Sequence, residues 1–215
     1  MSIALQITQG VFAMMSRALG PSPIVHLRPV SLLDRLKSGD PDAATELFER
    51  HIDTVERAIH GVLGPDAELE DLAHDAFLAA WKGVGSFRGP EQKLGAWVRG
   101  IAVKLALKKL RWRRRKRWWG GPGTDALPSM AGPTDTDTQS ALQRAFALMD
   151  QLPDVQRAAF GLRFIEGMQL AEVADALGVS LATTKRQLKA ARERFEALAA
   201  SDALLSGWYE RQGRA

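Results

Sequence analysis

The sequence predicts an all-α protein of two small helical domains joined by a flexible linker, the C-terminal domain containing a helix-turn-helix. Apolar residues recur at helical spacing from about residue 31 to residue 200, and no segment alternates as a half-buried strand would. Residues 120–140 are rich in Gly, Pro, Thr, Asp and Ser, which is the composition of a linker. Gly178 separates two short amphipathic segments, which predicts a turn between two helices.

Residues 1–30 are interpreted as a leader that precedes the first domain. Residues 3–17 are fairly apolar, but they lack a basic leading segment and are interrupted by polar residues, so neither a secretory signal nor a membrane span is predicted. The leader is a weak amphipathic helix, a disordered segment, or a misassigned start with translation beginning at Met14 or Met15. The chain has no Cys, which excludes disulfides, thiolate metal sites and Cys nucleophiles. We expect a cytoplasmic protein with no membrane span.

The N-terminal domain is expected to span residues 31–118. Asp40 places a capping carboxylate before Pro41 at the first position of a helix that runs to about His60 or Leu63. The apolar stripe of the following helix is unusually regular and consists of Leu69, Leu72, Ala73, Ala76, Phe77, Ala80 and Trp81.

A glycine-punctuated loop over residues 84–93 leads into the last helix of this domain, which ends in a dense basic run. Leu94, Trp97, Val98, Ile101, Ala102 and Leu105 form its inner face. Lys108 stands where the next apolar residue is expected, so we expect the helix to project past the core and to carry the basic run to Arg117. Trp112 interleaves with these cations, and the combination can neutralise phosphates and stack on bases. A solubilising helix end or a nuclear-type basic signal is the alternative.

After a linker at residues 119–139, the C-terminal domain is expected at residues 140–200, followed by a tail at residues 201–215. Its first helix passes through Leu142, Phe146 and Met149. The chain breaks at Leu152-Pro153 and resumes through Val155, Ala158, Ala159 and Leu162.

The helix-turn-helix occupies residues 167–195. Leu170, Val173, Ala174 and Leu177 form the buried stripe of its first helix, and Ser180 caps the second. The second helix is expected to turn Leu181, Thr184, Leu188, and Ala191 or Phe195 inward. Its outward or flanking residues are Ala182, Thr183, Lys185, Arg186, Lys189 and Arg192. Such a face suits the major groove of duplex DNA, the alternative being a solvated basic helix in an ordinary bundle.

These residues carry a family resemblance. Asp71-Leu-Ala-His-Asp75-Ala-Phe77-Leu-Ala-Ala-Trp81, then Phe87-Arg88-Gly89, Trp97, Ile101-Ala102 and Leu110-Arg111 resemble the N-terminal conserved domain of bacterial RNA polymerase sigma factors of the extracytoplasmic-function group, within the sigma-70 family. Leu152-Pro153, Gln156-Arg157, Leu162-Arg163-Phe164, Glu166-Gly167, Glu172-Val173-Ala174 and Leu177-Gly178-Val179-Ser180 resemble the C-terminal domain of that group.

The resemblance implies a dissociable specificity subunit that binds core RNA polymerase, recognises a promoter and helps to melt it. Asp71, His74 and Asp75 are then assigned to the surface that docks on the clamp helices of the largest polymerase subunit. The minus-ten element, where a base leaves the stack, is assigned to Arg88, Gln92, Lys93, Arg99, Lys104, Lys108, Lys109 and Arg111, whereas Phe87 is expected to pack. The minus-thirty-five element is read as duplex by Ala182, Thr183, Lys185, Arg186, Lys189 and Arg192. An anti-sigma factor that wedges between the two domains is a further implied partner.

Some residues depart from the family pattern. His74 stands where many relatives have Gln, and Lys108 where an Asp is frequent. Gln169 stands where a Ser or Thr cap is common, so Glu172 is expected to lack its usual reciprocal partner.

The main alternative function is a free-standing helix-turn-helix regulator with an N-terminal sensing or dimerising bundle. That alternative predicts binding to free operator DNA at two-fold half-sites. An enzyme is disfavoured because the four His residues lack metal spacing and no phosphate-cradling Gly-rich loop occurs. We therefore expect no catalytic residues, no metal and no cofactor.

Overall fold

The computed structural model describes residues 30–118 and 136–206, and every regular element in these ranges is helical, which confirms the all-α fold class. The helices are α2 (Leu32–Lys37), α3 (Pro41–Leu63), α4 (Leu69–Gly83), α5 (Leu94–Trp118), α6 (Thr136–Met149), α7 (Asp154–Phe160), α8 (Leu170–Leu177) and α9 (Leu181–Ala200). Short turns η1 (Val84–Ser86) and η2 (Glu91–Lys93) lie between α4 and α5, and one turn of π-helix, η3 (Gly161–Ile165), continues α7. Within the described ranges, no helix combines the length and apolarity that a membrane crossing needs.

The ends of α3 lie where the sequence predicts them. The Asp40 carboxylate accepts a hydrogen bond from the Asp42 N–H at 2.9 Å, and Pro41 fills the first helical position. Gly64, at φ 79°, ends the helix in a conformation that a residue with a side chain adopts only with strain. These end signals fix the length of α3, the helix on which both α4 and α5 pack.

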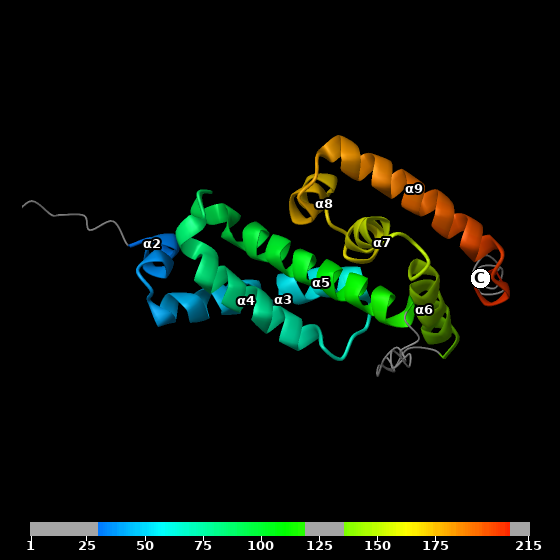
Figure 1. Ribbon diagram of the computed structural model, residues 1–215, viewed down its shortest axis with the longest axis horizontal. Coiled ribbons are helices and arrows are strands. Elements are labelled where there is room, and N and C mark those ends of the chain that lie inside the picture. The colour runs from blue at the N-terminus through cyan, green and yellow to red at the C-terminus, as the bar shows by residue number, and fades with distance from the viewer. Residues whose placement is uncertain (1–29, 119–135, 207–215) are drawn as a thin grey trace, which may run out of the picture. The chain divides into compact units, whose positions relative to one another are not determined.

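The green helix through the middle of Figure 1 is α5, which packs against α3, α4 and α8. Its predicted inner face is confirmed, with Leu94, Val98 and Ala102 fully buried. The expected projection past Leu105 is wrong, because the buried stripe continues through Ala106, Leu107 and Leu110. The buried positions move to an adjacent row of the helix after Leu105. Lys108 interrupts the first row, whereas Leu107 and Leu110 continue the second.

The helices after residue 135 are built around the predicted break at Leu152-Pro153. Phe146, Met149 and Leu152 are buried together with Ala191 of α9. Leu142 lies on α6, the helix predicted to pass through it, and its side chain is 37% exposed. Ala141 and Leu148 take the buried positions on that side of α6, where they pack with Leu205.

The described residues from Leu32 to Ser206 belong to one compact unit, because α3 and α5 pack against α7 and α8. The backbones of α3 and η3 cross so closely that a Cβ on Gly161 would overlap the Gly61 carbonyl oxygen. Arg157 of α7 donates to the carbonyls of Val62 and Leu63, at 2.9 and 2.6 Å. The domain boundaries themselves stay a prediction, since most of the expected linker lies outside the described residues.

Candidate functional site

The helix-turn-helix forms as predicted, with α8 and α9 meeting at Gly178 in the left-handed conformation (φ 68°, ψ 35°). The Ser180 hydroxyl caps α9 by accepting from the Thr183 N–H at 3.1 Å. Thr184, Leu188 and Ala191 are buried as expected, but Leu181 is 44% exposed, so its inward placement is wrong. Leu181 is the first residue of α9, directly after the Ser180 cap.

Glu172 has partners that the sequence did not predict. Its carboxylate accepts from the Gln169 backbone N–H at 2.9 Å and from Arg99 of α5 at 3.2 Å. The hydrogen bond from Gln169, helped by the charge of Arg99, holds the pKa of Glu172 below its usual range. The expectation that Glu172 lacks a reciprocal partner is therefore wrong. Its carboxylate bonds to the backbone N–H of residue 169, which is present whichever side chain that residue carries.

The N-terminal half of α9 presents cations to solvent. Lys185, Arg186 and Lys189 are all exposed, alongside Ala182 and the half-buried Thr183. Lys189 approaches Glu193 only at 3.9 Å, with both side chains well exposed. Because such exposed pairs are weak, these cations can exchange their partners for DNA phosphates at little cost.

Arg192 differs from the other α9 candidates. Its guanidinium donates to Glu196 at 2.6 Å and lies beside an aromatic groove at the C-terminal half of the helix. This pairing is the main reason why the pKa of Arg192 lies above its ordinary value. Arg192 therefore stands at the end of the cationic row rather than at its centre.

The basic run on α5 splits into exposed and paired residues. Lys104 and Lys108 are exposed and, among the described residues, form no ion pair. Lys109 instead bonds to Glu68. Further along, Arg113 bonds to Asp66, and Arg114 donates to the Asp150 carbonyl at 2.9 Å. A large part of the run thus neutralises carboxylates and caps carbonyls within the fold.

Three other minus-ten candidates approach carboxylates from the region after residue 135. Arg99, whose side chain is only 16% exposed, binds Glu172, and Lys93 lies 3.9 Å from Asp175. Arg111 lies 4.0 Å from the Asp154 carboxylate.

The loop before α5 buries Phe87 and leaves the minus-ten candidates Arg88 and Gln92 exposed. Phe87 is 8% exposed and packs on Trp97 with ring centroids 5.0 Å apart, which confirms the prediction that it packs. Arg88 is exposed and donates to the Gly85 carbonyl at 2.9 Å, and Gln92 is exposed. The loop therefore offers exposed polar side chains, Arg88 and Gln92 among them, next to a packed aromatic pair.

On α4, Asp71, His74 and Asp75 are all exposed. The His74 Nδ1 lies 2.8 Å from the Glu70 carbonyl, and its ring lies 5.4 Å from that of Phe48. Sequence reasoning missed Leu78, which is 50% exposed beside an apolar groove of about 570 Å³ between α3 and α4. Its signal in the sequence is an apolar residue on the polar face of an amphipathic helix.

Trp112, which the sequence predicts to stack on bases, lies among cations of its own helix. Its ring is 47% exposed, and the ammonium groups of Lys109 and Lys116 lie 5.3 and 5.2 Å from its centroid. For metal chemistry, the part of the chain that the structure describes contains no cluster of three His, Asp or Glu side chains.

Comparison with known proteins decides between the functions that this geometry permits. The family model described as sigma-70 region 2 matches residues 47–118, and the model described as sigma-70 region 4 matches residues 140–195. ECF RNA polymerase sigma factor SigM of Mycobacterium tuberculosis is 32% identical over 161 residues, which cover 75% of this chain and 79% of that protein. The chain belongs to the extracytoplasmic-function group of sigma-70 factors.

Two further relatives are also sigma factors of the extracytoplasmic-function group. This sigma factor is 33% identical to ECF RNA polymerase sigma factor BldN of Streptomyces coelicolor over 155 residues, or 70% of its own chain and 58% of that protein. It is 25% identical to ECF RNA polymerase sigma factor SigW of Bacillus subtilis over 171 residues, or 75% and 91% of the two chains. The free-standing regulator is therefore not favoured.

Solved structures agree on the fold. CnrH, solved in complex with the cytosolic domain of CnrY, matches with a TM-score of 0.56 and 24% identity over 80% of this sigma factor and 97% of that chain. RpoE, solved with the anti-sigma factor NepR from Bartonella quintana, matches with a TM-score of 0.52 and 22% identity over 74% and 97%.

Proposed function

We propose that this sigma factor reads the minus-thirty-five element with the N-terminal half of α9. The exposed row of Lys185, Arg186 and Lys189 on a helix capped by Ser180 carries the proposal, because a helix in the major groove must offer donors that no neighbouring element covers. Ala182 and Thr183 lie beside these cations and are small enough to approach base edges. Arg192 contributes at the end of the row after exchanging Glu196 for a phosphate.

For the minus-ten element, we propose that the exposed residues on α5 and its loop make the primary contacts. Lys104, Lys108 and Arg111 follow one another at spacings of four and three residues, which places them on one face of the helix. Arg88 and Gln92 extend this surface from the loop. Trp112 adds an exposed ring on which an unstacked base can lie.

Arg99 and Lys109 have a different role in this proposal, since carboxylates already hold them, whereas Lys93 is exposed and only loosely paired with Asp175. Arg99 joins α5 to α8 through Glu172, and Lys109 joins α5 to Glu68. Promoter contacts through Lys93 or Arg99 require their carboxylate partners to be replaced by phosphates. Such exchange would couple minus-ten binding to separation of α5 from α8.

The exposed face of α4 is proposed to bind the clamp helices of the largest polymerase subunit. Asp71 and Asp75 supply negative charge to this face, and His74 lies between them on the same exposed surface. The exposed Leu78 adds an apolar contact at its edge. A surface of this composition suits a stable but reversible protein contact.

The remaining partners follow from this role. The protein acts in initiation without a catalytic residue or cofactor of its own, in the cytoplasm where polymerase and chromosome meet. We include an anti-sigma factor among its partners because the CnrH and RpoE structures are of complexes with a second protein. Core polymerase and promoter DNA remain the partners that the family implies.

The proposal is tested with the variant Lys185→Ala/Arg186→Ala/Lys189→Ala in the full chain. We expect loss of promoter-specific transcription with unchanged binding to core polymerase, because the altered residues lie on α9 alone. The slope of log affinity against log salt for duplex DNA should fall by about 0.9 for each lost phosphate contact.

A matched control removes the same charge from exposed positions outside the proposed surfaces, as Lys37→Ala/Arg57→Ala/Arg194→Ala. This control should keep promoter-specific transcription. Loss of core binding in the α9 variant, or equal loss of transcription in the control, would contradict the assignment of α9.

A further inference from the structure

Leu181 is the large apolar residue of α9 that the fold leaves exposed. Its side chain is 44% exposed, and it joins none of the hydrophobic clusters formed by the described residues. Leu188, seven residues further along the same helix, is buried in the core. The apolar surface of Leu181 is therefore available to a ligand.

Leu181 shares the outer face of α9 with the cations proposed to meet the minus-thirty-five element. Lys185 follows it by four residues and Lys189 by eight, so the three side chains stand in one row along the helix. Ala182, which is also exposed, lies beside the start of this row. Because helical side chains lean toward the N-terminus of their helix, Leu181 stands in front of the cations.

The turn before α9 fixes the position of Leu181. Gly178 ends α8, and the Ser180 hydroxyl accepts from the Thr183 N–H at 3.1 Å. Thr184 is buried and donates to the Ser180 carbonyl, also at 3.1 Å. The end of α9 that carries Leu181 is thus held by contacts on both sides of that residue.

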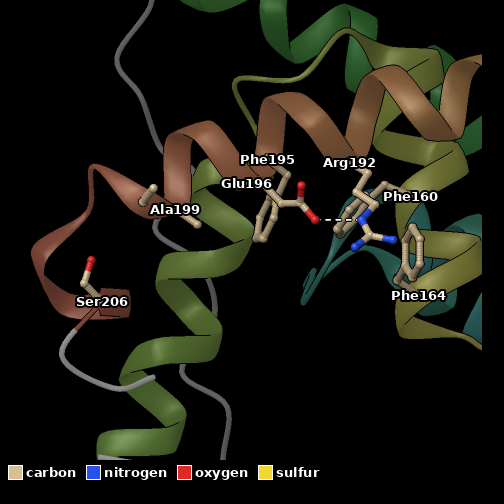
Figure 2. Close-up of a pocket in the computed structure, with 8 residues that line it drawn as sticks. Phe160, Phe164, Arg192, Phe195, Glu196, Ala199 and Ser206 are labelled. Atoms are coloured by element: carbon tan, nitrogen blue, oxygen red, sulfur yellow. Dashed lines mark hydrogen bonds and ion pairs between the residues drawn. The ribbon is translucent and has the colours of Figure 1, made fainter. Parts of the chain in front are cut away.

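The other end of α9 has a different setting. Figure 2 shows Arg192 turned toward Glu196, beside the rings of Phe160 and Phe195. The Arg192 guanidinium donates to the Glu196 carboxylate at 2.6 Å. Because a carboxylate already holds the cation at this end, the first half of α9 is the part that can approach base edges.

Duplex DNA displays one kind of apolar group to such a helix, the C5-methyl group of thymine in the major groove. A recognition helix contacts base edges with its N-terminal residues, and Leu181 is the first residue of α9. A leucine side chain has neither a donor nor an acceptor, so it distinguishes bases by contact with this methyl group.

We propose that Leu181 contacts the methyl group of a thymine in the minus-thirty-five element and thereby favours an A·T pair at one position. The inference rests on the proposed reading of that element by α9. The cations behind Leu181 supply affinity through phosphates and guanine acceptors, whereas Leu181 supplies discrimination at its own position.

The test removes the methyl group from the DNA. The holoenzyme formed by the full chain and core polymerase first selects its minus-thirty-five element from duplex promoters with a randomised upstream segment. Each thymine of the selected element, on either strand, is then replaced singly by deoxyuridine, which lacks only the C5-methyl group. We expect one replacement to raise the dissociation constant about fourfold, the effect of one buried methyl group.

Two leucine variants connect this effect with Leu181. Leu181→Ala should bind the thymine and deoxyuridine duplexes equally, because its shortened side chain no longer reaches the methyl group. Leu204→Ala removes a leucine of similar exposure, 43%, from the segment after α9, and it should keep the full difference between the two duplexes. Both variants should bind core polymerase as the parent does.

Equal affinity of the parent for every thymine duplex and its deoxyuridine counterpart would overturn the proposal, as would a selected element without an A·T pair. A difference that persists in Leu181→Ala would assign the methyl contact to another residue. Loss of core polymerase binding in Leu181→Ala would assign Leu181 to a protein contact instead. Either result would refute the role proposed for Leu181.

The variant Lys185→Ala/Arg186→Ala/Lys189→Ala separates this inference from the proposed function. If that variant selects the same element as the parent with the same affinity, α9 does not read the element and both proposals fail. If the variant selects no element and the parent is insensitive to the methyl group, the assignment of Leu181 fails and that of the cations stands.

Discussion

Arg157→Ala should cost this sigma factor a large part of its folding stability. The Arg157 side chain is 3% exposed, and it pairs with Asp150. Its guanidinium also donates to the carbonyls of Val62 and Leu63, at 2.9 and 2.6 Å. These carbonyls are among the last four of α3, which no helical N–H can satisfy. Arg157 thus closes the end of a helix that lies far away in the sequence.

The magnitude follows from what the substitution leaves behind. Arg157→Ala leaves the buried carbonyls of Val62 and Leu63 without a partner, at about 1–3 kcal/mol each, and the total cost is about 3–5 kcal/mol once the lost packing is included. The Asp150 side chain is 38% exposed, so water solvates it after the substitution. With a urea dependence of about 2 kcal/mol per molar, the unfolding midpoint should fall by roughly 1.5–2.5 M. The measurement is urea unfolding followed by circular dichroism, with the slope checked for two-state behaviour.

Two further variants make the interpretation of Arg157 specific. Arg157→Lys keeps the charge but cannot make the diverging hydrogen bonds of a guanidinium, so it should lose an intermediate amount of stability. Arg194→Ala removes an exposed Arg that bonds to Gln156 at 2.8 Å, and it should stay within about 0.5 kcal/mol of the parent. A loss below about 1 kcal/mol in Arg157→Ala would refute the helix-closing role.

Three more predictions test other parts of the structure. Burial, aided by the charges of Arg50 and Arg99, lowers the pKa of His51 below the 6.5 of a free imidazole. Between pH 6.5 and the lowered pKa, the unfolded chain therefore binds more protons than the folded chain. The free energy of unfolding should fall as the pH falls through this window. Urea unfolding between pH 8 and pH 5 should show a shallower decline in His51→Asn, and an equal decline would contradict the assignment. Gly178→Ala should lower the free energy of unfolding by about 1–2 kcal/mol and weaken duplex DNA binding, because φ 68° strains a residue with a Cβ. As a control, Gly39→Ala, at φ 82°, should lose a similar amount of stability and keep its affinity for DNA. Asp71→Asn/Asp75→Asn should weaken core polymerase binding about tenfold in a titration and leave duplex DNA binding unchanged, and a DNA defect would count against the α4 assignment.

Local signals in the sequence predict most of the fold. The cap at Asp40, the left-handed Gly178 and the Ser180 cap each act within a few residues, so the ends of α3, α8 and α9 follow directly from them. The buried positions of α9 at Thr184 and Leu188 also follow from helical spacing. Errors arise at the first residue of a helix, as at Leu181, or where the buried stripe shifts to an adjacent row, as in α5.

The site was harder to predict because its partners come from distant parts of the chain. Arg99 meets Glu172 across 73 positions, and Arg113 meets Asp66 across 47. Spacing within one helix identifies a cation but not the carboxylate that another helix brings to it. The basic run of α5 therefore looked uniform in the sequence, whereas the structure separates exposed Lys104 and Lys108 from residues that hold the fold together.

The most direct test of the account is size-exclusion co-migration of the full chain with bacterial core RNA polymerase, followed by transcription from a pool of genomic promoter fragments. The account predicts co-migration and new promoter-specific transcripts that core polymerase alone does not make. Failure to bind core polymerase, with duplex DNA binding retained, would contradict the proposed division between α4 and α9.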